Sequence, residues 1–549
     1  MKQRSFFYFL AVSAVVLLLT GIGGCNWLAR ESPLTRLQNG SETTPEAAMF
    51  IPKQAPVTVS LLVNPDRIGE QQQSRSEINQ LKTSLLANTG LDYRRDIQPW
   101  LGNEITVAVS SIDIDHDVEN GQQTGYLMAL ATVNPAKSRE FLELLFSKRA
   151  IAGTALVSEQ YKGVKLIYDK QNPQDQSTAK SEGKLSGAVV GDRFVLLAND
   201  PKVLKDAINN VQAPGLNLTN SSQYQQALTL LPPRRIGVTF LNLPSLAMWR
   251  GLQLAQTYQS QIVALELKPQ GLLVETSLLS AAKIQENLLS APDLSQPVGA
   301  LQYIPSETGF SISGSDLSRY KKLADYPTIS RLVNQPLADL QTRWGIDLPR
   351  DIFSWVQGEY ALGVLPVSDQ KAPDLVFVAE KSNAAEQGIL HLDALASSQG
   401  LSISNLTIGE QKISAWTQLA TAPASSSNLD RESITLKAKV HGVHATVGKY
   451  EIFTTSIEAM DTVLKSPQIG SLVDNPKFQT SLATLPPPNK GYLYLDWQAS
   501  QGVVEELPIF KLLEVLGNPF FKNLQALTIS SYGGDTGLLK GSVFFQLKA

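Results

Sequence analysis

An acidic run is the stretch of this sequence that most resembles a metal site. It extends from Ser111 to Gly121 and has a carboxylate at every second position. Alternate residues of an extended segment point to the same side, so these carboxylates could surround Ca²⁺, which prefers oxygen ligands. The run lacks the EF-hand pattern, because Val118 stands at the sixth position, where glycine is required. We therefore interpret it as a solvated hairpin loop and keep its carboxylates as weak metal candidates: Asp113, Asp115, Asp117 and Glu119.

Two other patterns could support nucleophilic or metal chemistry. Ser177 and Lys180 have the spacing of serine–lysine hydrolases, but they lie in a polar loop and not at the start of a buried helix. His441 and His444 are three residues apart in a strand-like run, which sends their side chains to opposite faces. The sequence contains no nucleophile elbow, phosphate-binding loop or His-Glu-x-x-His motif. We therefore expect no enzyme activity, no catalytic residue, no cofactor and no metal.

The amino terminus has the features of an export signal. Lys2 and Arg4 precede an apolar run, and small residues then lead to Cys25, the only cysteine. This arrangement resembles a bacterial lipoprotein signal, in which Cys25 would be acylated; the alternatives are an uncleaved signal anchor and simple secretion. We expect a signal segment at residues 1–25 and a polar tether at residues 26–46. All three alternatives place the body outside the cytoplasm, in the periplasm or an equivalent compartment.

The bulk composition excludes several classes of protein. A chain of 549 residues is long enough for more than one domain. Its net charge of −3 gives no electrostatic case for nucleic-acid binding, which usually needs a basic face. A single cysteine excludes an intramolecular disulfide and a cysteine-based zinc site.

One fourteen-residue segment occurs twice and indicates how the body is built. Leu91–Glu104 matches Ile346–Glu359 with six identical residues (Asp, Arg, Asp, Ile, Trp and Glu), where chance would give about one. The first aspartate of each copy, Asp92 or Asp347, is well placed to cap a short helix. A tryptophan three residues after an isoleucine shares its helical face and is most simply a core anchor, although a ligand-stacking role is the alternative. The predicted anchors are Asp96, Trp100, Asp351 and Trp355.

Other blocks repeat at nearly the same separation. Ile51-Pro52 recurs as Ile304-Pro305, and Leu231-Pro232-Pro233 recurs as Leu485-Pro486-Pro487. The offset stays between 253 and 257 residues, which is too long for a solenoid. We predict two tandem homologous domains at residues 47–284 and 298–549, joined by a linker at residues 285–297.

The predicted elements favour an α+β fold. Short strands separated by tight glycine turns, such as Lys162-Gly163 and Gly191-Asp192, indicate mostly antiparallel pairing. Helices are expected at residues 76–87, 135–148, 201–210 and 222–230. We predict that each domain is a mostly antiparallel sheet with helices packed on one side.

With these motifs in place, the chain resembles a bacterial, largely cyanobacterial family known as domain of unknown function 3352. The resemblance rests on the Ile-Pro starts, the Arg-Asp-Ile-x-x-Trp turns and the late Leu-Pro-Pro blocks, and it covers residues 47–549. It implies an envelope or periplasmic location behind an N-terminal membrane segment. It implies no catalytic residue.

These inferences lead to an expected function of binding or scaffolding in the cell envelope. The membrane is the expected partner of the N-terminal segment, and an envelope protein or a hydrophobic ligand is the expected partner of the body. A periplasmic carrier of a lipid or other hydrophobic ligand is the alternative function. A hydrolase with an unrecognised site is the third.

Overall fold

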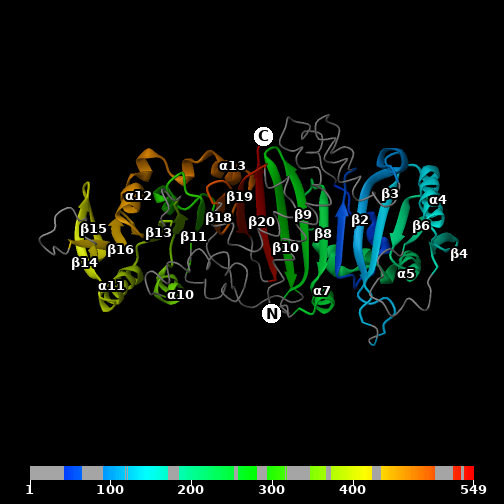
Figure 1. Cartoon of the computed structure of the whole chain (residues 1–549), viewed down its shortest axis with the longest axis horizontal. Coiled ribbons are helices and arrows are strands. Elements are labelled where there is room, and N and C mark those ends of the chain that lie inside the picture. The colour runs from blue at the N-terminus through cyan, green and yellow to red at the C-terminus, as the bar shows by residue number, and fades with distance from the viewer. Residues whose placement is uncertain are drawn as a thin grey trace, which may run out of the picture.

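The protein is an elongated molecule in which strands follow one another along the whole length (Figure 1). The computed structural model describes residues 42–64, 91–117, 119, 121–170, 185–252, 258–280, 294–315, 317, 347–365, 373–422, 435–500, 523–532 and 537–548. The signal segment, most of the tether, the predicted helix at 76–87 and most of the predicted linker lie outside these residues. Among the described helices, none is both long and apolar enough to cross a membrane.

The first half, residues 47–284, contributes strands β1 to β10. They are β1 (Val57–Leu61), β2 (Leu101–Ser111), β3 (Gly125–Thr132), β4 (Leu156–Tyr161), β5 (Val164–Asp169), β6 (Ser186–Val190), β7 (Phe194–Ala198), β8 (Gly237–Asn242), β9 (Tyr258–Lys268) and β10 (Gly271–Ser280). Its helices are α4 (Pro135–Ile151), α5 (Pro201–Gln212), α6 (Ser222–Leu228) and α7 (Leu243–Arg250), with shorter turns η2 (Glu46–Phe50), η3 (Tyr93–Ile97), η6 (Pro214–Leu216) and η7 (Leu218–Asn220). Neither β4 nor α7 was expected from the sequence.

The second half, residues 298–549, contributes strands β11 to β20. They are β11 (Phe310–Gly314), β12 (Tyr360–Val364), β13 (Leu375–Glu380), β14 (Ser402–Ile408), β15 (Gln411–Ala422), β16 (Thr435–Val447), β17 (Tyr450–Thr454), β18 (Gly491–Asp496), β19 (Leu524–Tyr532) and β20 (Leu538–Leu547). Its helices are α10 (Leu348–Asp351), α11 (Asn383–Ser398), α12 (Ile457–Ile469) and α13 (Pro476–Thr484), with turns η8 (Gly299–Tyr303), η9 (Phe353–Trp355) and η10 (Leu472–Asp474).

Local sequence signals explain where several elements begin. Helices α4, α5 and α13 each start with an Asn or Asp followed by proline, and the capping side chain accepts an amide hydrogen bond of the first turn. Proline at the first helical position loses no hydrogen bond there. The hairpin turn Lys162-Gly163 has positive φ angles of 48° and 83°, as a two-residue turn between twisted strands requires.

The described strands form one continuous antiparallel sheet of twenty strands. Their spatial order is β4-β5-β6-β7-β3-β2-β1-β8-β9-β10 in the first half, followed by β20-β19-β18-β11-β12-β13-β17-β16-β15-β14 in the second. The pairing sequence of one half therefore recurs in reverse order in the other. This arrangement confirms the α+β class and the antiparallel pairing.

Strands β10 and β20 join the halves, and we name their pairing the central seam. In the first half, paired residues on β8, β9 and β10 are Phe240, Ile262 and Ser277. The corresponding paired residues on β18, β19 and β20 are Tyr494, Thr528 and Phe544. Ser277 is therefore equivalent to Phe544, and four residues earlier Leu273 is equivalent to Lys540. At the central seam Ser277 lies opposite Lys540, and Leu273 lies opposite Phe544. Each position thus meets the equivalent of its partner, which is the contact made by a two-fold axis.

Helices cover both faces of the sheet, so the prediction of helices on one side is wrong. On β7, Val195 packs with Leu142 and Phe146 of α4, whereas the next residue, Leu196, packs with Leu204 of α5. Figure 1 shows the corresponding arrangement of α11 and α12 about the strands of the second half. Successive strand residues point to opposite faces, and here both are apolar, so each face needs its own cover.

Candidate functional site

The repeated turns have the same hydrogen bonds in both halves. Asp96 accepts the backbone amide of Asp92 and two hydrogen bonds from the Arg95 guanidinium, at 2.8, 2.8 and 3.1 Å. In the second half, Asp351 accepts the corresponding three bonds from Asp347 and Arg350 at the same distances. These bonds hold the pKa of Asp96 below its usual value, and the Arg95 bond is the largest cause. The predicted N-caps are also present, since Asp92 and Asp347 accept amide bonds from the arginines.

Both predicted tryptophans are buried. Trp100 is 1% exposed and lies 4.9 Å from the Phe141 ring, and Trp355 is 7% exposed. Each indole N–H donates to the carbonyl of the aspartate four residues earlier, at 2.8 Å in the first half and 2.7 Å in the second. Their burial leaves no ring face for a stacked ligand, so these residues fasten the turn to the sheet.

The last identical residue of the repeat has a role that the sequence analysis missed. Glu104 is buried and accepts the amides of Glu46 and Ala47, both at 2.9 Å, where the chain enters the first half. Glu359 accepts the amide of Gly299 and the Tyr450 hydroxyl at 3.1 and 2.6 Å. Burial raises the pKa of Glu104. Each glutamate thus holds the 3₁₀ turn, η2 or η8, that opens its half.

The acidic loop is organised by its own backbone. Asp115 accepts the amide of Asp117, Asp117 accepts that of Glu119, and Asp113 accepts that of Gln123. Each of these carboxylates thus binds a backbone amide at a different point of the loop, and the bonds do not bring the carboxylates together. Within the described ranges, no group of three or more His, Cys, Asp or Glu side chains is arranged to hold a metal ion.

Other candidates are separated or lie outside the described part of the chain. Cys25 and Ser177 fall in undescribed segments, so their roles stay predictions. His444 lies on β16, where its ring is 3.1 Å from the Asp393 carboxylate, which also accepts the Trp416 N–H at 2.7 Å. Burial opposes ionisation of Asp393, but these two bonds hold its pKa below the usual value. His441 occupies the bulge between β15 and β16.

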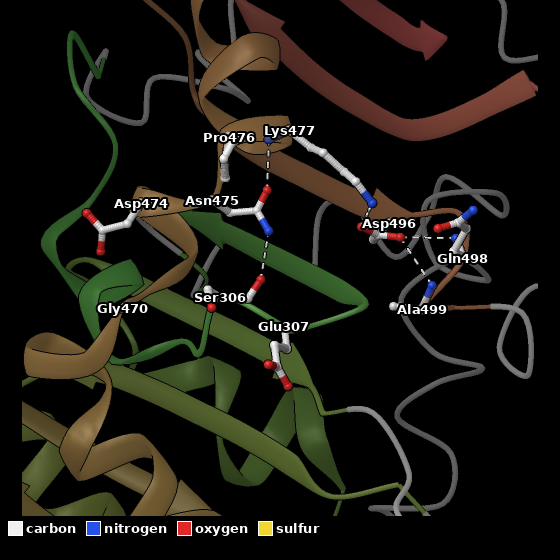
Figure 2. Close-up of a pocket in the computed structure, with 10 residues that line it drawn as sticks. All are labelled: Ser306, Glu307, Gly470, Asp474, Asn475, Pro476, Lys477, Asp496, Gln498 and Ala499. Carbon is white, nitrogen blue, oxygen red and sulfur yellow. Dashed lines mark hydrogen bonds and ion pairs between the residues drawn. The ribbon is translucent and has the colours of Figure 1, made fainter. Parts of the chain in front are cut away.

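A pocket with a volume of about 690 Å³ lies in the second half (Figure 2). Lys477 pairs with Asp496 at 2.6 Å, and Asp496 also accepts the amides of Gln498 and Ala499. Asn475 caps α13 and donates to the carbonyl of Ser306 at 2.8 Å. These contacts hold the side chains of Asn475, Lys477 and Asp496 in place around the pocket.

Two further carboxylates line this pocket. Asp474 accepts the backbone amide and the hydroxyl of Ser471, which lower the pKa of Asp474. Glu307 lies between Asp474 and Asp496 in the view of Figure 2. With three carboxylates and one lysine, the lining is negative overall. This site was not expected from the sequence, since its residues come from three separate segments.

The first half has neutral amides at the corresponding four places. The amide of Leu218 donates to Ile51 as that of Leu472 donates to Ile304, both at 2.7 Å, which makes the turns η7 and η10 equivalent. Position by position, the charged residues Glu307, Asp474, Lys477 and Asp496 correspond to Gln54, Asn220, Gln223 and Asn242. The one reversal is Lys53, which stands where Ser306 stands. These four charges therefore have no counterpart at the corresponding places of the first half.

Replacing Trp100 with alanine should destabilise the protein strongly. Trp100→Ala should lower the free energy of unfolding by roughly 3–5 kcal/mol, as removal of a large core side chain does. Trp100→Phe keeps most of the ring contact but loses the N–H bond, so it should cost much less. Urea unfolding followed by circular dichroism measures both. An alanine variant with an unchanged midpoint would contradict the core role.

Removing Arg95 should weaken the protein near neutral pH and make its stability less dependent on pH. The folded-state pKa of Asp96 lies below its unfolded value, so this carboxylate stabilises the fold above about pH 4 and the effect is lost as pH falls through the folded pKa. Arg95→Gln should raise the pKa of Asp96 toward its unfolded value and so lower the free energy of unfolding near neutrality, with little change once Asp96 is protonated. Urea unfolding followed at about pH 7 and again at about pH 3 tests this.

Arg94→Gln is the matched control, because Arg94 is exposed and the charge change is the same. Its free energy of unfolding near neutrality should equal that of the unmodified protein. Equal values for the two variants at about pH 7 would show that the Arg95–Asp96 bonds add nothing.

Comparison with known proteins gives one family and a distant structural likeness. No curated protein matches the chain. Crystal forms I and III of TP0453 are 10% identical to it and form IV is 11% identical, each with a TM-score of 0.25. The aligned parts cover 44%, 46% and 43% of this chain and 82%, 90% and 81% of those chains, for forms I, III and IV. This likeness is too weak to support a functional argument. The family described as "Protein of unknown function (DUF3352)" matches residues 10–547, essentially the whole chain, and the protein therefore belongs to that family.

Proposed function

We propose that this protein is a membrane-tethered binding protein of the cell envelope, and that its second half takes a small polar ligand with a positively charged group. The observation that carries the proposal is the exchange of four neutral amides for four charged residues around the pocket of about 690 Å³. Charged side chains placed in a concave site orient a ligand and select it by charge. The net negative lining favours a cation.

The proposal includes two tandem homologous domains, residues 47–284 and 298–549, of which one acquired the site. The shared strand pairing and the identical turn bonds support this duplication. A further support is an exchanged aromatic pair. Tyr224 packs edge-on against Phe240 at 5.0 Å, and Phe478 packs against Tyr494 at 5.2 Å, so the hydroxyl has moved to the other partner.

Binding is favoured over catalysis by the character of the carboxylates. A general base works best with a pKa near the operating pH, but the pKa of Asp474 is lowered by its bonds to Ser471. Asp496 is held by Lys477 and two backbone amides. The pocket favours a polar ligand over the hydrophobic cargo of a carrier, since seven of its ten lining residues carry polar or charged side chains. A smaller pocket, of about 20 Å³, is too small for such a cargo.

Amine-bearing probes test the ligand class. Putrescine, choline and arginine should raise the melting temperature of the full chain, whereas acetate and glucose should not. The variant Glu307→Gln, Asp474→Asn, Lys477→Gln and Asp496→Asn installs the residues of the first half and should abolish the shift. Binding of no amine probe, or equal shifts in the variant, would refute the proposal.

Glu140→Gln is the matched control, because it removes an exposed carboxylate on α4 in the other half. It should respond to amine probes as the unmodified protein does. If the control loses the response as well, then general surface charge and not the pocket attracts the probe.

The membrane tether is tested at Cys25. Diacylation is expected, since a single acyl chain gives only marginal membrane affinity. Cys25→Ser should leave an unprocessed precursor in the membrane fraction, and the mature unmodified protein should carry labelled fatty acid at its first residue. A mature chain that begins downstream of Cys25 would rule out the lipoprotein anchor.

A further inference from the structure

The two ends of the twenty-stranded sheet differ in how their edges are protected. Strand β4 ends the first half and pairs with β5, and strand β14 ends the second half and pairs with β15. Neither has a second strand partner among the described residues. An unpaired edge offers a row of amides and carbonyls to another strand, so proteins usually blunt it with charges, prolines or bulges.

Strand β4 has such protection. Glu159 lies within it, pairs with Lys205 at 2.9 Å and accepts the Tyr168 hydroxyl at 2.9 Å. The Lys205 bond is the largest cause that lowers the pKa of Glu159, so the edge carries a charge at neutral pH. A strand added to β4 would have to pass this carboxylate.

Strand β14 has none of these devices. Its seven residues, Ser-Ile-Ser-Asn-Leu-Thr-Ile, include no charge and no proline, and their register with β15 is unbroken from Ser402 to Ile408. The strand is largely exposed, with Ile403 and Leu406 each 42% exposed on opposite faces. Beyond its end, Leu419 of β15 is 70% exposed along the same edge.

We propose that β14 is the docking edge for a second copy of this chain, which adds its own β14 in antiparallel register about Asn405. This register opposes Ser402 to Ile408, Ile403 to Thr407 and Ser404 to Leu406, so all seven residues pair and no like charges meet. On one face of the paired strands the two copies each contribute Ile403, and on the other face each contributes Leu406. The result is a two-fold pair of molecules with one sheet running through both.

The central seam supports this occupant over an unrelated peptide. There the same sheet already grows by an antiparallel, two-fold contact between equivalent strands, β10 and β20. The two-fold contact also closes the assembly, because each copy uses β14 and, of the described strands, leaves the β4 edge outside. A head-to-tail contact would instead use the Glu159 edge and continue into a filament.

Cysteine cross-linking tests the register. In the proposed pair the two residues at position 405 lie about 4.5–5.5 Å apart at Cα, within disulfide range. Asn405→Cys in the full chain should therefore give an oxidised dimer, and mass spectrometry should find two 405-containing peptides joined to each other. That product is distinct from any bridge through Cys25.

Two matched variants should not cross-link. Ile403→Cys would sit opposite Thr407 and about 14 Å from its own copy, at about 3.4 Å per residue. Ser158→Cys places the thiol on the exposed β4 edge. Equal cross-linking of Asn405→Cys and Ile403→Cys would overturn the register, and cross-linking of Ser158→Cys alone would move the contact to the other edge.

Sedimentation equilibrium of the full chain in detergent tests the pair without cross-linking. The unmodified protein should be dimeric, and Leu406→Lys should weaken the dimer roughly tenfold or more, because two lysines would meet beside the axis. Ser158→Lys should leave the mass unchanged. An unmodified protein that stays monomeric, or that binds a different protein through β14, would overturn the proposal; unchanged circular dichroism of Leu406→Lys excludes misfolding as the cause.

Discussion

The hydrogen bonds between β10 and β20 are the contact on which the architecture depends. Nine residue pairs, from Gly271–Gln546 to Leu279–Leu538, turn two ten-stranded halves into one sheet. The seam is buried on both faces, with Leu273 and Phe544 on one and Leu272 and Phe545 on the other. Without it, each half would expose a long apolar edge strand, which is the kind of surface that aggregates. The seam therefore makes each half depend on the other.

Within each half, the repeated turn provides the second constraint. A carboxylate ties the turn together, an indole fixes it to the sheet, and a glutamate a few residues later holds the 3₁₀ turn that opens the half. The six identical positions thus either make these contacts or pack into the core, so each contributes to the fold of its half. Most other positions, including those at the surface, differ between the halves.

That divergence is where a function can arise. The same framework carries neutral amides in the first half and charges at the pocket of the second. It carries Glu159 on one outer strand and an uncharged β14 on the other. Position 187 is a glycine packed against Leu142 and Phe146, whereas its counterpart, His444, contacts Asp393. Comparison of the halves separates what the fold needs from what it tolerates, because each half controls for the other.

The sequence by itself determined the local features. The repeat, the N-caps, the hairpin turns at Gly163 and Gly191, and most strands could be predicted, because such signals depend on neighbouring residues. It did not reveal that helices cover both faces, since a buried strand with two apolar faces has no clear alternation. Strand β4 was missed because its alternation of apolar and polar residues is weak. Helix α7 was missed because it begins at the residue after the end of β8, with no loop between them.

Only the tertiary structure decided the central seam, the role of Glu104 and Glu359, and the pocket. Each of these joins residues far apart in the chain, as Glu307 and Asp496 are, and the pairing depends on the three-dimensional order of the strands. Residue types and their spacing do not predict that order. The sequence therefore determined the units of this protein, and long-range strand pairing decided how the units meet and where the charges gather.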